Sequence, residues 1–567
     1  MSRIGVVNFT RMGDLIQCGP FLDGVRENSP ESHLILIVLE NFVDAARRLP
    51  MVDEVISFPL DRFIPHLDSR RISLAELYAG LEDFATLLRR RRFDYFYNLA
   101  HTRLSAALTW LLHVPATYGL TYDSSGHLLV THPWINYYFY VTLNRTWNPF
   151  NLVEMYLPIA PAVPSRPRLK FCVLSDDERE TAGLLSAAGV QNNSPIIAFQ
   201  MGAADEQRRW PVAAFVELAR QLICAHNAQI LLLGTAEETS YSQTLIHALN
   251  SKNLFDVTGK TSMGTLGAVL KHCQVLVSND TGTIHLAAAM ETPTVGIYLG
   301  PAAAKDTGPY GDGHLLFEPQ LPCAPCSYHT ACAHCACHEV IQPSDVAAAV
   351  ALQLGKPNHA WQVWDRPRLR IRRTQVTETG QLRLIPLARL PLDRQTLLFS
   401  FYRVFWPLLL GDERFALMSP KDAWACEIRS LADVYEFCDP SALLTDEDKE
   451  AIGGYQKIAA HAEVAVEVLN RELRSKRPSL VELREMILKL ARCDAALAHI
   501  EERFLAWAPL AQFIRVLRGN VPDESPTGLA AACRDVYGTL VRGSQLLTSL
   551  RNEMISTPAR EREAVHA

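Results

Sequence analysis

The chain has 567 residues, of which 48% are hydrophobic and 20% are charged, and its formal net charge is -6. This length accommodates about three or four domains of ~150 residues each, and the slightly acidic balance argues against a nucleic-acid partner. No run reaches the ~18 to 20 apolar residues that a membrane span needs, and the first residues lack the apolar stretch of a signal peptide. We therefore expect a cytoplasmic protein.

Residues 3–145 alternate between apolar β-type runs and helical patterns. The predicted strands are 4–9, 33–39, 52–58, 93–99 and 116–119, and the clearest helix between them covers 74–91. Such alternation is typical of a parallel sheet with helices on both faces. Five prolines between 149 and 168 then interrupt any helical period. We interpret 1–150 as an N-terminal Rossmann-like domain and 151–170 as a linker.

A second alternating block follows the linker. Its predicted strands are 196–200, 229–234, 254–257, 274–277 and 294–298, which indicates a second Rossmann-like domain over 171–356. Beyond it, 368–374 and 381–386 predict a β-hairpin, and amphipathic runs near 445–475, 480–508 and 527–553 predict helices. The fold class is therefore α/β, with two tandem doubly wound domains and a mostly α-helical C-terminal extension, 357–567.

Residues 278–289 read Ser-Asn-Asp-Thr-Gly-Thr-Ile-His-Leu-Ala-Ala-Ala and follow an apolar strand. A strand that turns directly into a helix leaves backbone N–H groups and the positive end of the helix dipole directed at the turn. The side chains of Thr281, Thr283 and His285 can add hydrogen-bond donors. A diphosphate fits such a turn, and the alternative is a structural turn in which Asp280 only caps the helix.

Three further motifs also fall where strands end. Gly13 allows close backbone approach after the first strand, and Asp14 is either a helix cap or a general base for an attacking hydroxyl. Arg208 precedes a helix and either contacts a diphosphate or lies in a solvated basic loop. Glu237 either accepts from ribose hydroxyls or is an ordinary acidic residue at a helix start.

This ordered set of motifs resembles the ADP-heptose heptosyltransferases of glycosyltransferase family 9. The resemblance covers roughly residues 1–355 and is carried by Arg11-Met12-Gly13-Asp14, Arg208-Arg209-Trp210-Pro211, Gly259-Lys260-Thr261-Ser262, Ser278 to Gly282 with His285 to Ala289, and Gly300-Pro301. It implies a glycosyltransferase-B fold, with an acceptor-binding N-terminal domain and a nucleotide-sugar-binding second domain. It also implies an inverting transfer that needs no catalytic metal.

The resemblance assigns a role to each matching residue. Asp14 matches the catalytic base, with Arg11 and Gly13 on the acceptor side. Arg208 stands where the family usually has a Lys that contacts the donor diphosphate. The charge is kept, but Lys and Arg differ in reach and donor geometry, so we expect the donor to be held differently. The remaining donor-side residues are Asp280 toward the sugar, Thr281, Gly282, Thr283 and His285 around the diphosphate, and Thr261, Met263 and Glu237 toward the adenosine.

Five cysteines lie between residues 323 and 337. The pair Cys323 and Cys326, followed by Cys332 and Cys337, has the spacing of a tetrahedral metal site, and Cys335 is extra. Many family members look similar here, and in the protein heptosyltransferases that modify autotransporters the cluster is implicated in iron binding. We expect a structural zinc or iron, because four thiolates leave no open position for catalysis. The alternative is a loop of reduced thiols.

The predicted function is transfer of a heptose, or a related sugar, from an ADP-heptose-type nucleotide sugar to a hydroxyl acceptor. Lipopolysaccharide core and a protein Ser or Thr both remain open as acceptors. The basic run 89–92 is either a solvated helix end or a contact to the inner-membrane surface. The C-terminal helices are expected to bind a partner or form an oligomer. The alternative function is a non-catalytic scaffold that binds sugar nucleotides.

Overall fold

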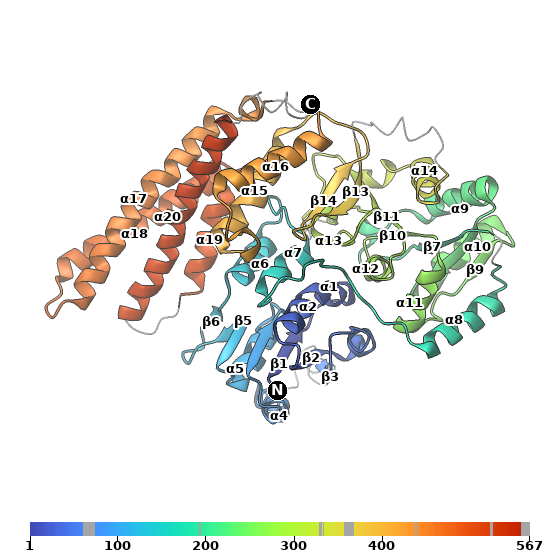
Figure 1. The fold of residues 1–567 in the computed structure, drawn as a ribbon, viewed down its shortest axis with the longest axis horizontal. Coiled ribbons are helices and arrows are strands. Elements are labelled where there is room, and N and C mark those ends of the chain that lie inside the picture. Colours follow the sequence, from blue (N-terminus) through green and yellow to red (C-terminus); the bar gives the residue numbers. More distant parts are fainter. Residues whose placement is uncertain are drawn as a thin grey trace. The chain divides into compact units, whose positions relative to one another are not determined.

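The computed structural model describes residues 1–60, 74–191, 194–327, 332, 334–356, 368–436, 439–521 and 526–556 (Figure 1). They form two compact units. One unit contains Met1 with 8–64 and 150–388, and the other contains 2–7, 65–149 and 389–567. Within the described residues, none of the helices has both the length and the apolar character needed to cross a membrane.

The first sheet has six strands in the order β3-β2-β1-β4-β5-β6. β1 pairs with β4, β4 with β5 and β2 with β3 in parallel, whereas β6 runs antiparallel to β5. The bounds are β1 Arg3–Asn8, β2 His33–Leu39, β3 Glu54–Phe58, β4 Tyr95–Asn98, β5 Ala116–Tyr122 and β6 Leu128–Val130. The five predicted strands are confirmed, and β6 is additional. Its three half-buried residues are too few to show a period in the sequence.

The helices of this part of the chain follow the predicted alternation. They are α1 Met12–Gln17, α2 Gly19–Asn28, α3 Val43–Ala46, α4 Leu74–Arg89, α5 Arg103–Leu112 and α6 Pro133–Leu143. The predicted helix over 74–91 is therefore confirmed to within two residues.

The second sheet has eight strands in the order β14-β13-β12-β11-β10-β7-β8-β9. The bounds are β7 Ile196–Gln200, β8 Gln229–Leu233, β9 Leu254–Asp256, β10 Val275–Asn279, β11 Thr294–Ile297, β12 Leu315–Pro319, β13 Leu369–Val376 and β14 Leu382–Pro386. Strands β7 to β12 are parallel, and all except the half-buried edge strand β9 are almost entirely buried, as their continuous apolar runs predict. The helices are α8 Ser175–Ala188, α9 Val212–His226, α10 Thr239–Leu249, α11 Met263–His272, α12 Gly282–Ala289, α13 Ala304–Thr307 and α14 Pro343–Gln353.

Two features differ from the expected order of domains. The hairpin β13-β14 was expected within the C-terminal extension, but β13 pairs antiparallel with β12 and extends the second sheet. The proline-rich stretch also contains a short helix, α7 (Leu152–Tyr156), all five residues of which are buried. Asn151 and Glu154 cap it reciprocally, so this part of the expected linker is a packed element.

The C-terminal part of the chain is helical, as predicted. Its helices are α15 Arg394–Leu410, α16 Pro420–Val434, α17 Asp446–Arg474, α18 Leu480–Arg503, α19 Ala508–Gly519 and α20 Pro526–Ser556. Helix α17 packs against both α18 and α20. The single run expected over 480–508 ends at Arg503, and a turn that buries Trp507 separates it from α19.

Candidate active site

Hydrogen bonds of the Asn279 side chain hold the turn between β10 and α12 in place. Asn279 is buried at the end of the strand, and its side chain donates to the Met201 carbonyl at 2.7 Å and accepts from the Trp210 N–H at 3.0 Å. Among the residues that the structure describes, no side chain caps the start of α12. The first N–H groups of this eight-residue helix therefore remain available to an anion.

Helix α1 packs against the start of α12 through two glycines. A Cβ on Gly13 would lie 2.7 Å from Cδ2 of His285 and 3.3 Å from the Cα of Gly282. A Cβ on Gly282 would lie 2.1 Å from the methyl carbon of Met12 and 3.3 Å from the Gly13 nitrogen. Because carbon atoms do not approach so closely, a Cβ on Gly13 would displace the buried His285 ring, whereas a Cβ on Gly282 would first displace the flexible end of the Met12 side chain. The motifs that the sequence predicts at residues 11–14 and 280–285 are thus in contact.

Gly13→Ala is expected to push α1 away from α12 and to lower kcat/KM by about 100-fold, since a misplacement near 1 Å has that effect on positioned groups. Steady-state kinetics with a sugar donor measures this. Gly19→Ala is the matched control, because a Cβ at Gly19 meets nothing within 4 Å. Equal activity of both variants would show that the contact does not position the site.

Asp14 lies on α1, is half-buried, and accepts a long hydrogen bond of 3.4 Å from the Arg11 N–H. Burial raises the pKa of this carboxyl to about 6, and Arg11 opposes the rise. The charges of Asp280 and Arg208 also act on the pKa of Asp14, the first raising it and the second lowering it. The carboxylate therefore shares one electrostatic environment with the donor-side pair, and its pKa suits a general base near neutral pH.

Arg208 and Asp280 form a buried ion pair. Nη2 of Arg208 lies 2.5 Å from Oδ2 of Asp280 and donates to its backbone carbonyl at 2.8 Å. Among the described residues, Nε of Arg208 has no hydrogen-bond partner although it is buried. The guanidinium is thus oriented by Asp280 and retains a donor for an anion. The sequence predicted both residues on the donor side but not their pairing.

Gln17 is a site residue that the sequence analysis did not identify. Its Nε2 lies 3.3 Å from Nε2 of His285 and 3.4 Å from the Gly13 carbonyl. Burial lowers the pKa of His285 to about 3, so the imidazole is neutral near pH 7. His285 can therefore serve the expected diphosphate site as a neutral donor but not as a cation. The signal for Gln17 was its position one helical turn after Gly13 and Asp14.

Of the two adjacent acids after β8, Glu237 is the one predicted toward the adenosine, and Glu238 is directed toward the end of β7. Glu237 is exposed. Glu238 accepts from Nε2 of Gln200 at 3.0 Å and from the Thr235 N–H at 2.9 Å. A Cβ on Gly202 would lie 1.5 Å from Oε1 of Glu238, so this carboxylate is packed against the end of β7.

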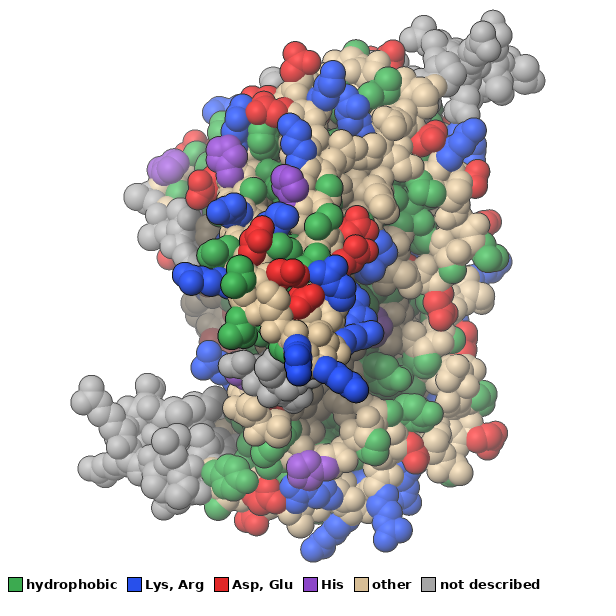
Figure 2. Space-filling view, turned by 90° about the vertical axis from the view of Figure 1, so that its left-hand side faces the viewer, with side chains coloured by type: hydrophobic (Ala, Val, Ile, Leu, Met, Phe, Trp, Pro, Cys, Tyr) green, Lys and Arg blue, Asp and Glu red, His purple; other side chains and the backbone are tan. Residues whose placement is uncertain are grey.

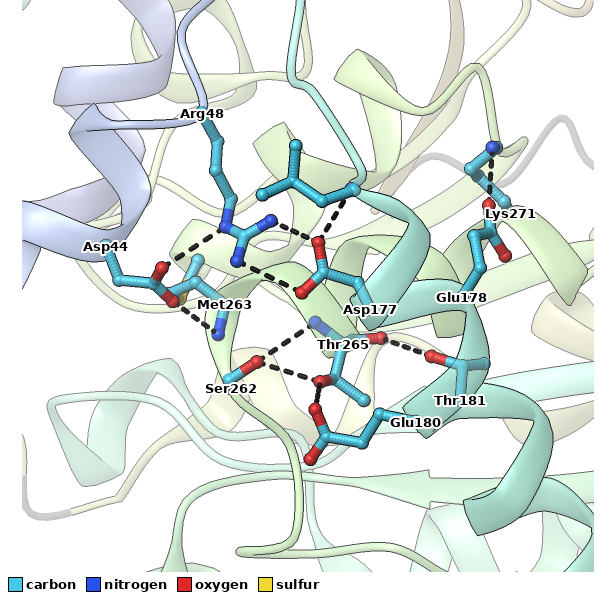
Figure 3. A network of polar contacts seen from close by, with 11 residues as sticks. Asp44, Arg48, Asp177, Glu178, Glu180, Thr181, Ser262, Met263, Thr265 and Lys271 are labelled. Carbon is cyan, nitrogen blue, oxygen red and sulfur yellow. Dashed lines mark hydrogen bonds and ion pairs between the residues drawn. The ribbon is translucent and has the colours of Figure 1, made fainter.

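Met263, predicted on the adenosine side, is the first residue of α11 (Figure 3). Thr261, predicted on the same side, lies just before the helix cap Ser262. The Met263 N–H donates to Oδ2 of Asp44 at 3.2 Å, and Asp44 also pairs with Nε of Arg48 at 3.2 Å. Arg48 in turn forms a bidentate ion pair with Asp177. This network fixes the start of α11 against α3 and α8, and it already uses the backbone N–H of Met263.

The cysteine segment contacts the loop that carries Arg208. The Cys326 N–H donates to the Gly300 carbonyl at 2.9 Å, and the His338 ring lies 3.0 Å from the Gln207 carbonyl. Burial and the neighbouring thiols raise the pKa of Cys326, so the sulfurs lie near one another. Among the residues of this segment that the structure describes, no three His, Cys, Asp or Glu side chains are arranged to hold a metal ion. Residues 328–331 and 333 lie outside the description.

Two helix-flanked sheets, each built mainly of parallel strands, are the architecture of the glycosyltransferase-B fold. The crystal structure of a glycosyl transferase family 9 protein from Veillonella parvula has this fold, with a TM-score of 0.50 and 19% identity over 63% of this chain and 97% of that one.

Residues 82–336 match the model of glycosyltransferase family 9 (heptosyltransferase). Lipopolysaccharide heptosyltransferase 2 of Salmonella typhimurium is 24% identical over 54% of this chain and 85% of its own length. The enzyme of the same name from Escherichia coli K12 is 26% identical over the same shares. The resemblance to family 9 is confirmed, and the chain is a glycosyltransferase.

Proposed function

We propose that this enzyme transfers a heptose from an ADP-heptose-type donor to a hydroxyl group of lipopolysaccharide core, with inversion at the anomeric carbon. The observation that supports this proposal is the packing of α1, which carries Asp14, against the start of α12 within one unit of the protein, where the charges of Arg208 and Asp280 act on Asp14. The named relatives are lipopolysaccharide heptosyltransferases, which supports the sugar and the acceptor.

In this proposal Asp14 removes the proton of the acceptor hydroxyl as its oxygen attacks the anomeric carbon. The bond between that carbon and the diphosphate oxygen breaks as the new glycosidic bond forms, through an oxocarbenium-like transition state. The negative charge that grows on the leaving ADP meets the N–H groups at the start of α12 and the guanidinium of Arg208. Neutral His285 adds a hydrogen-bond donor at most.

The donor and acceptor are tested together by incubating the purified protein with ADP-, GDP- and UDP-sugars and with heptose-deficient lipopolysaccharide core. Mass spectrometry is expected to show one added heptose on the core, and only with ADP-heptose. If instead the core stays unmodified and Ser or Thr residues on proteins of the producing cell carry the sugar, the acceptor is a protein and not the lipopolysaccharide core. Binding of donor without turnover with either acceptor would favour the non-catalytic scaffold.

The basic run at the end of α4 is partly used within the protein. Arg89 donates from Nε to the Leu111 carbonyl at 2.7 Å and pairs with Glu82 at 2.7 Å. This supports a structural role for Arg89. We propose a cytoplasmic location, where an ADP-sugar is available. Any peripheral contact with the inner membrane would then be made by the arginines next to Arg89.

We further propose a structural zinc or iron held by Cys323, Cys326, Cys332 and Cys337. Four thiols suit a tetrahedral shell for either metal, although the described side chains are not arranged around one ion. Because this segment contacts Gln207 and Gly300, we expect the metal to support the Arg208 loop rather than to take part in the reaction.

Elemental analysis of purified protein is expected to find about one zinc or iron per chain. Cys326→Ser is expected to lose the metal, lower the melting temperature and weaken ADP binding. Cys426→Ser is the control, since Cys426 is an exposed thiol elsewhere in the chain. If the purified protein contains neither metal, or if Cys326→Ser keeps the metal content of the wild type, the cysteine segment is a loop of free thiols.

A further inference from the structure

Helix α18 is apolar on two opposite faces. Its inner face buries Met486, Leu490, Cys493, Leu497 and Ile500 against the other helices. Its outer face exposes large hydrophobic side chains, with Leu480 at 77%, Val481 at 78%, Ile487 at 59% and Leu488 at 51%. Large hydrophobic side chains gathered in the open on one helix face are typical of an interaction surface.

The outer face also carries small residues and two unpaired charges. At ~100° per residue, Arg484, Leu488, Ala491, Ala495, Ala498 and Glu502 fall on one stripe of α18. All six are exposed, and neither Arg484 nor Glu502 has an ion-pair partner among the described residues. Hydrophobic side chains also lie open between charged ones on the face of the molecule drawn in Figure 2.

The outer face of α18 is complementary to a second copy of the same face that runs in the opposite direction. We propose that the enzyme forms a twofold dimer in which α18 packs antiparallel against α18 of a second copy. A register that places Arg484 opposite Glu502 of the other copy also places Leu488 opposite Ala498 and Ala491 opposite Ala495. The same register brings Val481 opposite Leu505, which is 70% exposed just after the helix.

The charges favour a second copy over a lipid surface. A helix that lies on an anionic membrane carries mainly Lys and Arg beside its apolar stripe. Here the acidic residues Glu485 and Glu502 are exposed on the same side as Arg484. In an antiparallel pair each Arg484 meets a Glu502, whereas on an anionic surface both glutamates would be repelled. The alternating large and small side chains also allow two helices to interdigitate.

The test uses full-length protein in analytical ultracentrifugation from 1 to about 100 µM, a range that covers moderate dimer affinities. The wild type is expected to shift from monomer to dimer as concentration rises, and Leu488→Glu to remain a monomer with an unchanged melting temperature. Val464→Glu is the matched control, because Val464 is 50% exposed on the neighbouring helix α17. It is expected to dimerise like the wild type.

A charge exchange tests the register. Arg484→Glu and Glu502→Arg are each expected to weaken the dimer by at least tenfold, and the double variant to restore it. A wild type that stays monomeric, a dimer that survives Leu488→Glu, or a double variant that stays dissociated would each overturn the proposal. Monomers that sediment with anionic vesicles, and lose this binding in Leu488→Glu, would assign the face to a membrane instead.

Discussion

Asp14→Asn is expected to lower kcat by 10²- to 10⁴-fold while ADP-heptose binds with nearly unchanged affinity. A general base contributes about that factor, and an asparagine oxygen can still accept from the Arg11 N–H. Steady-state kinetics gives kcat, and isothermal titration calorimetry gives donor affinity. Asp176→Asn, at an exposed position of α8, is the control and should retain full activity.

The pH dependence follows from the pKa of about 6 for Asp14. Because only the carboxylate can accept a proton, kcat/KM should be low at pH 5, rise through pH 6 and level off above pH 7. The Asp14→Asn variant should lack this rise of kcat/KM with pH. An activity that is flat from pH 5 to pH 8 would exclude Asp14 as the base, even if the substitution lowers kcat.

The same pKa shift affects stability in the opposite sense. The folded state holds the Asp14 proton more tightly than the unfolded chain does. The stability that protonated Asp14 contributes to the free energy of unfolding is therefore present below about pH 4 and is lost as the pH rises through 6. Asp14→Asn is therefore expected to raise the melting temperature at pH 8 and to leave it nearly unchanged at pH 4. Such a gain on removal of a charged group is typical of functional sites.

Arg208→Met is expected to have the second large effect, because it removes the guanidinium that pairs with the buried carboxylate of Asp280. Breaking a buried pair in this way costs about 3–5 kcal/mol in the free energy of unfolding. Loss of a donor to the leaving diphosphate should also lower kcat by about 10²-fold or more. Denaturant unfolding and steady-state kinetics measure the two effects.

A second substitution separates the two roles of Arg208. Arg208→Met with Asp280→Asn should recover much of the stability, since no unpaired charge remains, but not the activity. Arg209→Met is the matched control, because Arg209 bonds to the Ala203 carbonyl and the Tyr241 hydroxyl and leaves Asp280 paired. Recovery of activity in the double variant would show that Arg208 acts only on stability.

Much of the fold could be predicted because parallel strands that are buried on both faces leave continuous apolar runs. β7 and β10 are examples, and the turn after β10 was identified from its Asp-Thr-Gly sequence. The attachment of β13 to β12 could not be predicted, since strand order depends on pairings between distant segments. For the same reason, the hairpin was assigned to the wrong part of the chain.

The site was predicted at the level of its motifs but not of its contacts. The sequence identifies Gly13 and Asp280, yet the reasons for their residue types lie in contacts with His285 and Arg208. Gln17 was missed because its contact with His285 joins residues 268 positions apart. The packing of Glu238 against the end of β7 could not be predicted, because two adjacent acids look alike until the backbone directs one of them inward.

The most direct test of the account is a crystal structure of the enzyme with an unreactive ADP-heptose analogue. We predict that the diphosphate contacts the N–H groups of Gly282 and Thr283, and that the Asp14 carboxylate faces the anomeric carbon on the side opposite the leaving group. A sugar bound with Asp14 on the diphosphate side, or a diphosphate held away from the start of α12, would contradict the proposed mechanism.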